Sequence, residues 1–326
     1  MAVTIAEIQK LRTMTGAGMM DCKKALAESE GDMEKAIELI RKRGQAIAAK
    51  RSDRQASEGC VLAAEKDGFA AIIALKCETD FVAKNEDFIA LTRTILNKAI
   101  EMRAKSLDEV KNATIDGRTI AELVTDRSGI TGEKMELDYY EFVEGGTVTT
   151  YVHPGNKLAT LVAFKEEGAD YETIHEIAMQ VAAMNPLALD RDSVNPEIIE
   201  TEKKVAIEKT KQEQVQKKVE GALKKEGINP AHVDSEDHIA SNIAKGWITE
   251  EQGKRAMQIK EEVAAATVIP QQMIDNIVNG RLNKFFKEST LMEQTALMDE
   301  KFQVKDLLAS KGITATAFKR ITLNQE

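Results

Sequence analysis

The chain has 326 residues, 43% of them hydrophobic, and a formal net charge of −9. This length and apolar content predict a globular protein of two or three domains. The acidic balance argues against direct nucleic-acid binding, because neutralising phosphates requires an excess of Lys and Arg on at least one face. The three cysteines are too few and too widely spaced for a disulfide framework or a zinc site. No stretch resembles an export leader or a run of about 18 apolar residues, so we expect a cytoplasmic protein that does not bind membranes.

Residues 1–45 have the pattern of a module of three short helices. Thr4 is suited to begin a capping box before the first helix, which carries apolar residues on one face. Asp32 is suited to begin the third helix, and Gly44 to end it. Residues 46–58, which follow, are polar and basic without a clear apolar face, so we predict a linker, either a helix or a tether.

Residues 59–133 are predicted to form a first α+β subdomain. A strand at Gly59–Ala64 is expected to pair with Phe69–Cys77 across an Asp-Gly step that suits a tight hairpin turn. Asp87–Lys105 then has the apolar periodicity of a long amphipathic helix. Residues 107–131 are predicted to be short helices and loops.

Residues 134–195 repeat this pattern and are predicted to form a second, related α+β subdomain. Turns at Gly145-Gly146 and Pro154-Gly155 separate its strands, and Asn185-Pro186 ends the helix that follows. The predicted strands and helix are Met135–Val143, Thr147–His153, Leu158–Lys165 and Tyr171–Met184.

Residues 196–288 differ from both halves, because they are rich in Lys, Glu and Gln and read as successive helices. We predict an inserted helical arm. Most core positions of a heptad repeat in its first helix are polar, so we expect the arm to pack antiparallel on itself. Residues 289–326 are predicted to return to the second subdomain. The predicted elements of these two regions are Glu197–Lys225, Glu236–Lys245, Glu250–Ala266, Gln271–Lys287, Gln303–Ser310 and the strand Thr316–Leu323.

Two patterns could carry chemistry, and both have simpler interpretations. Gly16-Ala17-Gly18 lacks the third glycine of a phosphate loop and no strand precedes it, so a turn between helices is favoured. Cys77 could act as a thiol nucleophile with His153 and Asp80. Free cysteines are usually buried, however, and burial of Cys77 at a strand end is the favoured interpretation. The remaining histidines lack ligand-like spacing, so we expect neither a metal nor a cofactor.

Met19 and Met20 stand next to each other at the start of the second predicted helix. Adjacent helical residues point about 100° apart, so both cannot face one small core. We expect one of them to be buried and the other to be an adaptable apolar contact for a partner protein.

The segment Cys77–Lys84, CETDFVAK, lies where a strand gives way to a helix. Thr79 is a suitable N-cap, and Asp80 in the first turn suits the helix dipole. Phe81 has no such structural explanation, because the next apolar run begins only at Phe88. We therefore predict a one-turn helix that presents Phe81 for interaction.

Five segments occur in an order that is specific to one family of proteins. They are TGAGMMDCKKAL (Thr15–Leu26), GDMEKAIELIRKRG (Gly31–Gly44), CETDFVAK (Cys77–Lys84), IAMQVAA (Ile177–Ala183) and GRLNKFFKE (Gly280–Glu288). In this order the sequence resembles the elongation factor Ts family, the guanine-nucleotide exchange factors of bacterial elongation factor Tu. The resemblance covers nearly the whole chain. It implies a module like a ubiquitin-associated domain, two α+β core subdomains and an arm inserted in the second.

The resemblance also assigns roles to residues of this chain. It implies that Thr79, Asp80, Phe81 and Val82 disturb the magnesium site of elongation factor Tu, with the Phe inserting between partner side chains. Contacts of the N-terminal module with the GTPase would then lie near three apolar residues. These are Leu11, Met19 and Met20. The chain would promote exchange of GDP for GTP without being an enzyme.

Two departures from the family accompany this resemblance. Some members have His at the position of Gln180, where the side chain helps to perturb the phosphate loop of the GTPase. Gln180 can form hydrogen bonds but carries no charge, so we expect a weaker partner contact there. The arm is also longer than in many members, and residues 210–262 look inserted.

Two other classes of function remain open from the sequence. An enzyme of this sequence would use Cys77 as its nucleophile. A helical scaffold would depend on the arm at residues 196–288 and would have no need of Phe81.

Overall fold

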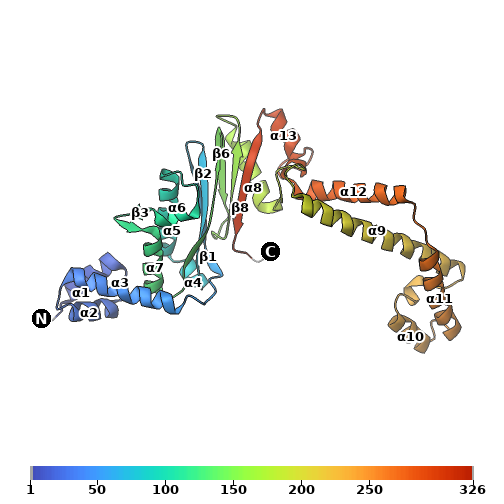
Figure 1. The fold of residues 1–326 in the computed structure, drawn as a ribbon, viewed down its shortest axis with the longest axis horizontal. Helices are drawn as coiled ribbons and strands as arrows, with labels where there is room; N and C mark the ends of the chain where they lie inside the picture. The colour runs from blue at the N-terminus through green and yellow to red at the C-terminus, as the bar shows by residue number, and fades with distance from the viewer. Residues whose placement is uncertain (1–2, 325–326) are drawn as a thin grey trace. The chain divides into compact units, whose positions relative to one another are not determined.

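The computed structural model of the chain describes residues 3–324. It has the predicted α+β fold, with helices around two three-stranded antiparallel sheets (Figure 1). Contacts divide the chain into two compact units, of which the second is Asp190–Glu293. The first unit contains the chain up to Leu189 and from Gln294 onward. None of the helices within residues 3–324 is long and apolar enough to cross a membrane.

Three helices form the N-terminal module, as predicted. Their bounds are α1 (Ile5–Thr15), α2 (Met19–Glu28) and α3 (Met33–Lys50). The predicted capping box at Thr4 is present, since Thr4 Oγ1 accepts from the N–H of Glu7 and the Glu7 carboxylate accepts from that of Thr4. Apolar residues of all three helices form a small core. It contains Ile8, Leu11, Ala17, Cys22, Ala25, Leu26 and Ala36.

Helix α3 does not end at Gly44, so that prediction was wrong, and residues 46–50 of the predicted linker are helical. Gly44 is buried, and it lies where α3 crosses α7 (Ile120–Thr131). A Cβ added to Gly129 of α7 would lie 2.2 Å from the Cα of Gly44. The glycine therefore permits a close crossing of two helix backbones, which outweighs its low helix propensity.

The first sheet has the order β1-β2-β5, with β1 (Glu58–Lys66), β2 (Phe69–Cys77) and β5 (Glu136–Glu144). The second has the order β6-β7-β8. Its strands are β6 (Thr147–Val152), β7 (Leu158–Phe164) and β8 (Ala315–Thr322). The final strand thus returns to the second sheet, as predicted from the sequence.

Strand β5 was predicted to belong to the second half, but it pairs with β2 of the first sheet. Gly145-Gly146 does not close a hairpin; it carries the chain from one sheet to the other. A Cβ at Gly145 would lie 2.5 Å from Phe164 O, and one at Gly146 would lie 2.3 Å from Lys165 O. The glycines are therefore needed for close backbone contact at this crossing. In the sequence, a Gly-Gly pair of this kind cannot be distinguished from a hairpin turn.

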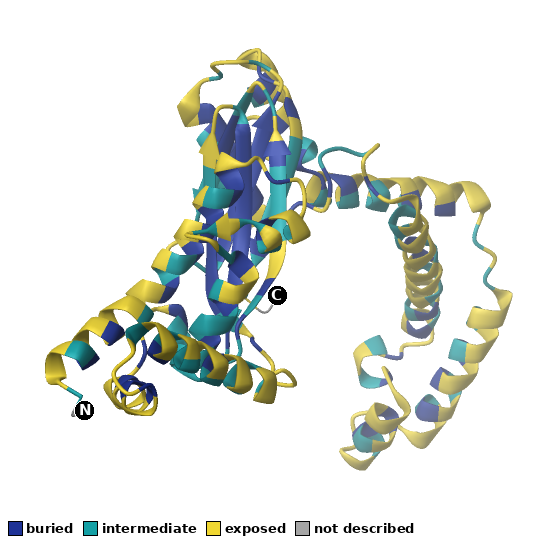
Figure 2. Ribbon diagram, turned by 60° about the vertical axis from the view of Figure 1, so that its left-hand side comes forward, coloured by how far each residue is buried: buried dark blue, intermediate teal, exposed yellow. Residues whose placement is uncertain are grey.

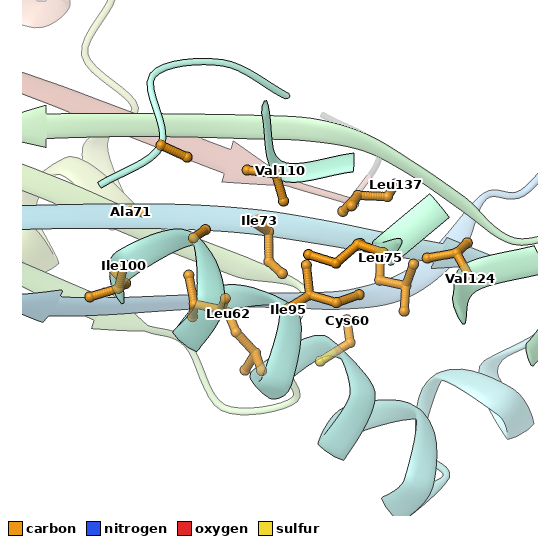
Figure 3. Packing of buried hydrophobic residues seen from close by; sticks show 14 of the residues in the cluster. Cys60, Leu62, Ala71, Ile73, Leu75, Ile95, Ile100, Val110, Val124 and Leu137 are labelled. Carbon is orange, nitrogen blue, oxygen red and sulfur yellow. The ribbon is translucent and has the colours of Figure 1, made fainter. Parts of the chain in front are cut away.

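The two sheets pack face to face through small and branched aliphatic side chains such as Ala70 and Ile72 of β2 and Leu161 of β7. The opposite face of the first sheet is covered by α5 (Glu86–Glu101) and its neighbours, where Ile73 and Ile95 meet (Figure 3). Strand β2 is consequently buried on both faces, which explains its continuous apolar run. Figure 2 shows this burial along both sheets.

The remaining elements of the first unit are short apart from α8 (Tyr171–Met184), which packs on β6 and β7. The predicted short helices of residues 107–131 include α7, which is a full helix. The others in this unit are α6 (Leu107–Asn112), the small hairpin β3 (Thr114–Ile115) and β4 (Arg118–Thr119), and α13 (Val304–Ser310). The short turn η2 (Leu291–Glu293) lies at the end of the second unit.

The second unit is a helical arm that packs antiparallel on itself, as predicted. Lys218 Nζ donates to Val268 O at 3.3 Å, while Glu213, earlier in the chain, pairs with the later Arg281 at 2.7 Å. Its elements are α9 (Pro196–Lys225), η1 (Pro230–His232), α10 (Glu236–Ala244), α11 (Glu250–Ala266) and α12 (Gln271–Ser289). The part that looked inserted has its own core. This core contains Val219, Leu223, Ile228, Val233, Ile239, Ile248, Ala256 and Ile259.

Candidate functional site

The segment after β2 forms the predicted one-turn helix, α4 (Asp80–Ala83). Thr79 is its N-cap, because Thr79 Oγ1 accepts from the N–H of Val82 at 3.4 Å. Ala83 is buried and Val82 packs against the core of the first sheet. Phe81, which directly precedes Val82, is 83% exposed, the largest fraction among the exposed large apolar side chains of residues 3–324. The helix therefore uses its inner face for anchoring and presents one aromatic ring to solvent.

Glu133, in the turn after α7, holds the start of this helix. Its Oε2 accepts from the backbone N–H groups of Glu78 and Thr79, each at 3.1 Å. Its Oε1 accepts from the Thr79 hydroxyl at 2.6 Å. Glu133 could not be predicted from the sequence, because it lies 54 residues from Thr79 and no local pattern connects the two.

Glu78 forms the reciprocal contact, because its carboxylate accepts from the backbone of the residue that follows Glu133. Its Oε1 accepts from the N–H of Lys134 at 2.7 Å. Arg51, the C-cap of α3, and Arg54 donate to the same carboxylate at 3.0 and 3.2 Å. The N–H of Lys134, followed by the two guanidinium groups, holds the pKa of Glu78 below its ordinary value against the opposing effect of burial. We call Glu78, Glu133 and the backbone groups that they bind the carboxylate clasp.

Asp80 lies on the outer side of α4 and pairs with Lys84 at 2.7 Å. The hydrogen bond from Lys84 lowers the pKa of Asp80, and the same bond raises the pKa of Lys84. Both side chains are substantially exposed, so the pair adds little to stability. Asp80 is therefore charged at neutral pH and can exchange Lys84 for another cationic group.

Cys77 is fully buried, and its thiol lies 3.2 Å from the carbonyl oxygen of Thr79, to which it donates. Burial, with a contribution from nearby Glu133, raises the pKa of this thiol to about 12. The structure does not join the suggested triad, since the ring of His153 contacts the Tyr151 hydroxyl and Asp80 pairs with Lys84. A nucleophilic cysteine needs a lowered pKa and access, and Cys77 has neither.

In the N-terminal module the prediction that one of two adjacent methionines is buried was wrong. Met19 and Met20 are 44% and 64% exposed, because α2 uses the face of Cys22 and Leu26 for its core. Leu11, in contrast, is completely buried. It is a core residue, and a surface contact through its side chain does not fit this structure.

Gln180 also differs from its expected place at a partner surface, because its side chain is 1% exposed. Its amide nitrogen donates to Gln294 Oε1 and to Thr295 O, both at 3.1 Å. Its amide oxygen accepts from the N–H of Leu297 at 2.7 Å. Gln180 therefore fastens the segment after the second unit to α8, and any influence on a partner must pass through that segment, whose Met298 is exposed.

Within the described residues, 3–324, no group of three or more His, Cys, Asp or Glu side chains is arranged to hold a metal ion. The elements assembled around α4 instead offer one exposed aromatic ring, an adjacent carboxylate and a rigid polar support. Such a set is suited to contact with another macromolecule.

Comparisons with known proteins agree in pointing to one family. The sequence model described as Elongation factor TS matches residues 78–234 and 222–325, which together are more than half of the chain. Elongation factor Ts of Parabacteroides distasonis is 59% identical over 331 residues, with both chains covered completely. The proteins of the same name from Phocaeicola vulgatus and Bacteroides fragilis are 58% and 56% identical, again with complete coverage of both chains.

Proposed function

Because this chain belongs to the elongation factor Ts family, and is thus a translation elongation factor, we propose that it binds elongation factor Tu with GDP and promotes the release of GDP and its exchange for GTP. The observation that carries the proposal is Phe81, an exposed aromatic ring on a one-turn helix whose start is fixed by Glu133. A ring held in this way can enter a partner with little further loss of conformational entropy, because the backbone that carries it is already ordered.

The proposed reaction needs no catalytic group on this chain. A P-loop GTPase holds GDP and Mg²⁺ through backbone N–H groups, a Lys side chain and the ligands of the metal. A factor that binds more tightly when those elements are displaced must lower the affinity for nucleotide. By linkage, nucleotide lowers the affinity for the factor in the same ratio, so exchange is accelerated in both directions.

In this mechanism Phe81 supplies the displacement. Burying its ring in the partner is worth about 1.5–3 kcal/mol, which is gained only in the displaced state. Asp80 lies beside it and carries a negative charge that can attract a cation away from its ligands. Exposed Met19 and Met20 supply a separate, adaptable contact that favours docking without acting on the magnesium site.

We also propose that the chain is not an enzyme. Cys77 is buried, its pKa is raised, and its hydrogen bond goes to a backbone carbonyl. A thiol-dependent activity would be lost in Cys77→Ala, whereas nucleotide exchange should remain. A purely structural scaffold would be indifferent to the loss of Phe81.

The deciding experiment is the release of fluorescent GDP from purified elongation factor Tu, with the full chain added in substoichiometric amounts. We expect faster release that saturates with elongation factor Tu concentration. Phe81→Ala should abolish most of the stimulation. Trp247→Ala removes a similarly exposed aromatic ring, 60% exposed and in the second unit, and should leave release unchanged. Absence of stimulation by the wild-type chain would refute the proposal.

A further inference from the structure

Helix α4 is too short to fix its own position. One turn of helix has few internal hydrogen bonds, and such a helix is unstable without external contacts. Val82 and Ala83 attach its inner face to the core. Apolar contacts of this kind set the depth of the helix but constrain its rotation weakly, because dispersion is non-directional.

The carboxylate of Glu133 supplies the missing directional contacts. It accepts from two consecutive backbone N–H groups and from one hydroxyl, which places its negative charge at the start of α4. Hydrogen bonds to an ionised acceptor are shorter and stronger than neutral ones. The negative charge of Glu133 also lies at the N-terminal end of α4, where the partial positive charge of the backbone N–H groups attracts it. The Thr79 hydroxyl then donates to Glu133 while it accepts from the N–H of Val82. The bond to Glu133 therefore orients the same hydroxyl that caps α4 at Val82.

The second half of the carboxylate clasp reaches the N-terminal module. Glu78 binds the N–H of Lys134 and the guanidinium groups of Arg51 and Arg54, just beyond α3. Lys134 Nζ in turn donates to Arg54 O at 2.8 Å. The end of α3, the start of α4 and the turn after α7 thus share one hydrogen-bond network.

We propose that Glu133 is a positioning residue for Phe81, acting through Thr79 and the N–H groups at the start of α4. This inference rests on the proposed function, because it assigns Glu133 a part in nucleotide exchange. Glu133 touches no partner group in this role. It fixes the direction in which the Phe81 side chain points away from the surface. This direction determines in what fraction of complexes the ring enters the partner correctly.

The test compares Glu133→Ala and Glu133→Gln with Glu122→Ala. Glu122 is a suitable control, because it lies on the same helix and caps its other end through Thr119. Glu133→Ala should lower the kcat of exchange about tenfold and leave KM for the elongation factor Tu–GDP complex nearly unchanged. Glu133→Gln keeps one acceptor oxygen and should recover most of the rate. Glu122→Ala should lower the melting temperature without changing kcat.

A second measurement does not depend on exchange. A fluorinated Phe placed at position 81 of the full chain reports the mobility of the ring by ¹⁹F NMR in the free protein. We expect a single restrained signal in the wild-type background and Glu122→Ala, and a narrower, shifted signal in Glu133→Ala. If the wild-type chain fails to stimulate GDP release but Glu133→Ala frees the ring, the proposed function is wrong and the positioning stands.

Two results would overturn the inference. One is a Glu133→Ala protein with an unchanged ring signal and an unchanged kcat. The other is a fall in kcat that is proportional to the fall in melting temperature and is the same in Glu133→Ala and Glu122→Ala. Should Glu133→Ala not fold, Thr79→Val removes the hydroxyl that Glu133 binds, keeps the side-chain volume, and must show the same fall in kcat.

Discussion

Phe81 and Gln180 come from two motifs that point to the same family, yet the structure treats them oppositely. Phe81 is 83% exposed, whereas Gln180 is 1% exposed and its amide is hydrogen-bonded to Gln294, Thr295 and Leu297. A family motif therefore locates a position in the fold but does not say whether the side chain is free to act. In one case the residue can meet a partner directly, and in the other it can act only by holding a neighbouring segment.

The sharpest test of this contrast is Phe81→Ala. Exchange efficiency should fall about 10- to 100-fold, because an aromatic burial worth roughly 1.5–3 kcal/mol is lost from the complex. The melting temperature of the isolated factor should not change, since the ring contributes almost no burial to its own fold. Stimulated GDP release and thermal unfolding are measured on the same preparation. Early melting with normal exchange would identify Phe81 as a core residue.

Gln180→Ala should show the reverse signature. The change removes the acceptor of the Leu297 N–H and the donor to Thr295 O, which we expect to lower the free energy of unfolding by about 2–4 kcal/mol. Chemical denaturation measures this loss. Exchange per folded molecule should fall less than in Phe81→Ala. A stable Gln180→Ala protein with defective exchange would restore the prediction of a direct partner contact.

The sequence was informative where the signals were local. Thr79 as N-cap and the exposure of Phe81 could be predicted, because a cap acts within one turn and no apolar residue at helical spacing was available to cover the ring. Glu133 could not be predicted, since its contact spans 54 residues and depends on how α7 meets the first sheet. The burial of Gln180 could not be predicted for the same reason, since its partners lie more than 100 residues away.

Glycines gave the other errors of the fold. Gly44 was predicted to end a helix, and Gly145-Gly146 was predicted to form a hairpin turn. All of these glycines lie instead where two backbones approach closely. Sequence alone does not separate a glycine needed for its backbone angles from one needed for its small size. The assignment of β5 to the wrong sheet follows directly from this ambiguity.

A smaller effect is expected from the two exposed methionines of the N-terminal module. The double change Met19→Ser with Met20→Ser should raise KM for the elongation factor Tu–GDP complex about 3- to 10-fold, because each loses part of an apolar contact. The kcat of exchange, reached at saturating elongation factor Tu–GDP complex, should be unchanged. Leu11→Ala is the contrasting variant, since it removes a fully buried side chain and should destabilise the module by about 2–5 kcal/mol. An unchanged KM in the double variant would remove the module from the docking surface.

The carboxylate clasp predicts a weak pH dependence. The pKa of Glu78 is lowered in the folded chain, mainly by the N–H of Lys134. Its contribution is therefore complete above the ordinary pKa of 4.5 and is lost as the pH falls through the lower folded value. Melting temperatures of wild type and Glu78→Gln should differ at pH 7 and converge as the pH falls below that range. A difference that grows on acidification would mean that the pKa shift has the opposite sign.

The smallest effect should come from the part of the arm that looked inserted. Its core of Val219, Leu223 and neighbouring side chains is built from residues of the arm itself. Replacing residues 212–262 with a short Gly/Ser link should therefore change stimulated GDP release by less than about twofold, since neither α4 nor the carboxylate clasp loses a contact. The shortened chain must also retain the first unit's melting transition, which calorimetry can resolve from that of the arm. A loss of exchange as large as that of Phe81→Ala, with this transition intact, would make the arm part of the mechanism. Direct action on the partner would then not be confined to the exposed ring of Phe81.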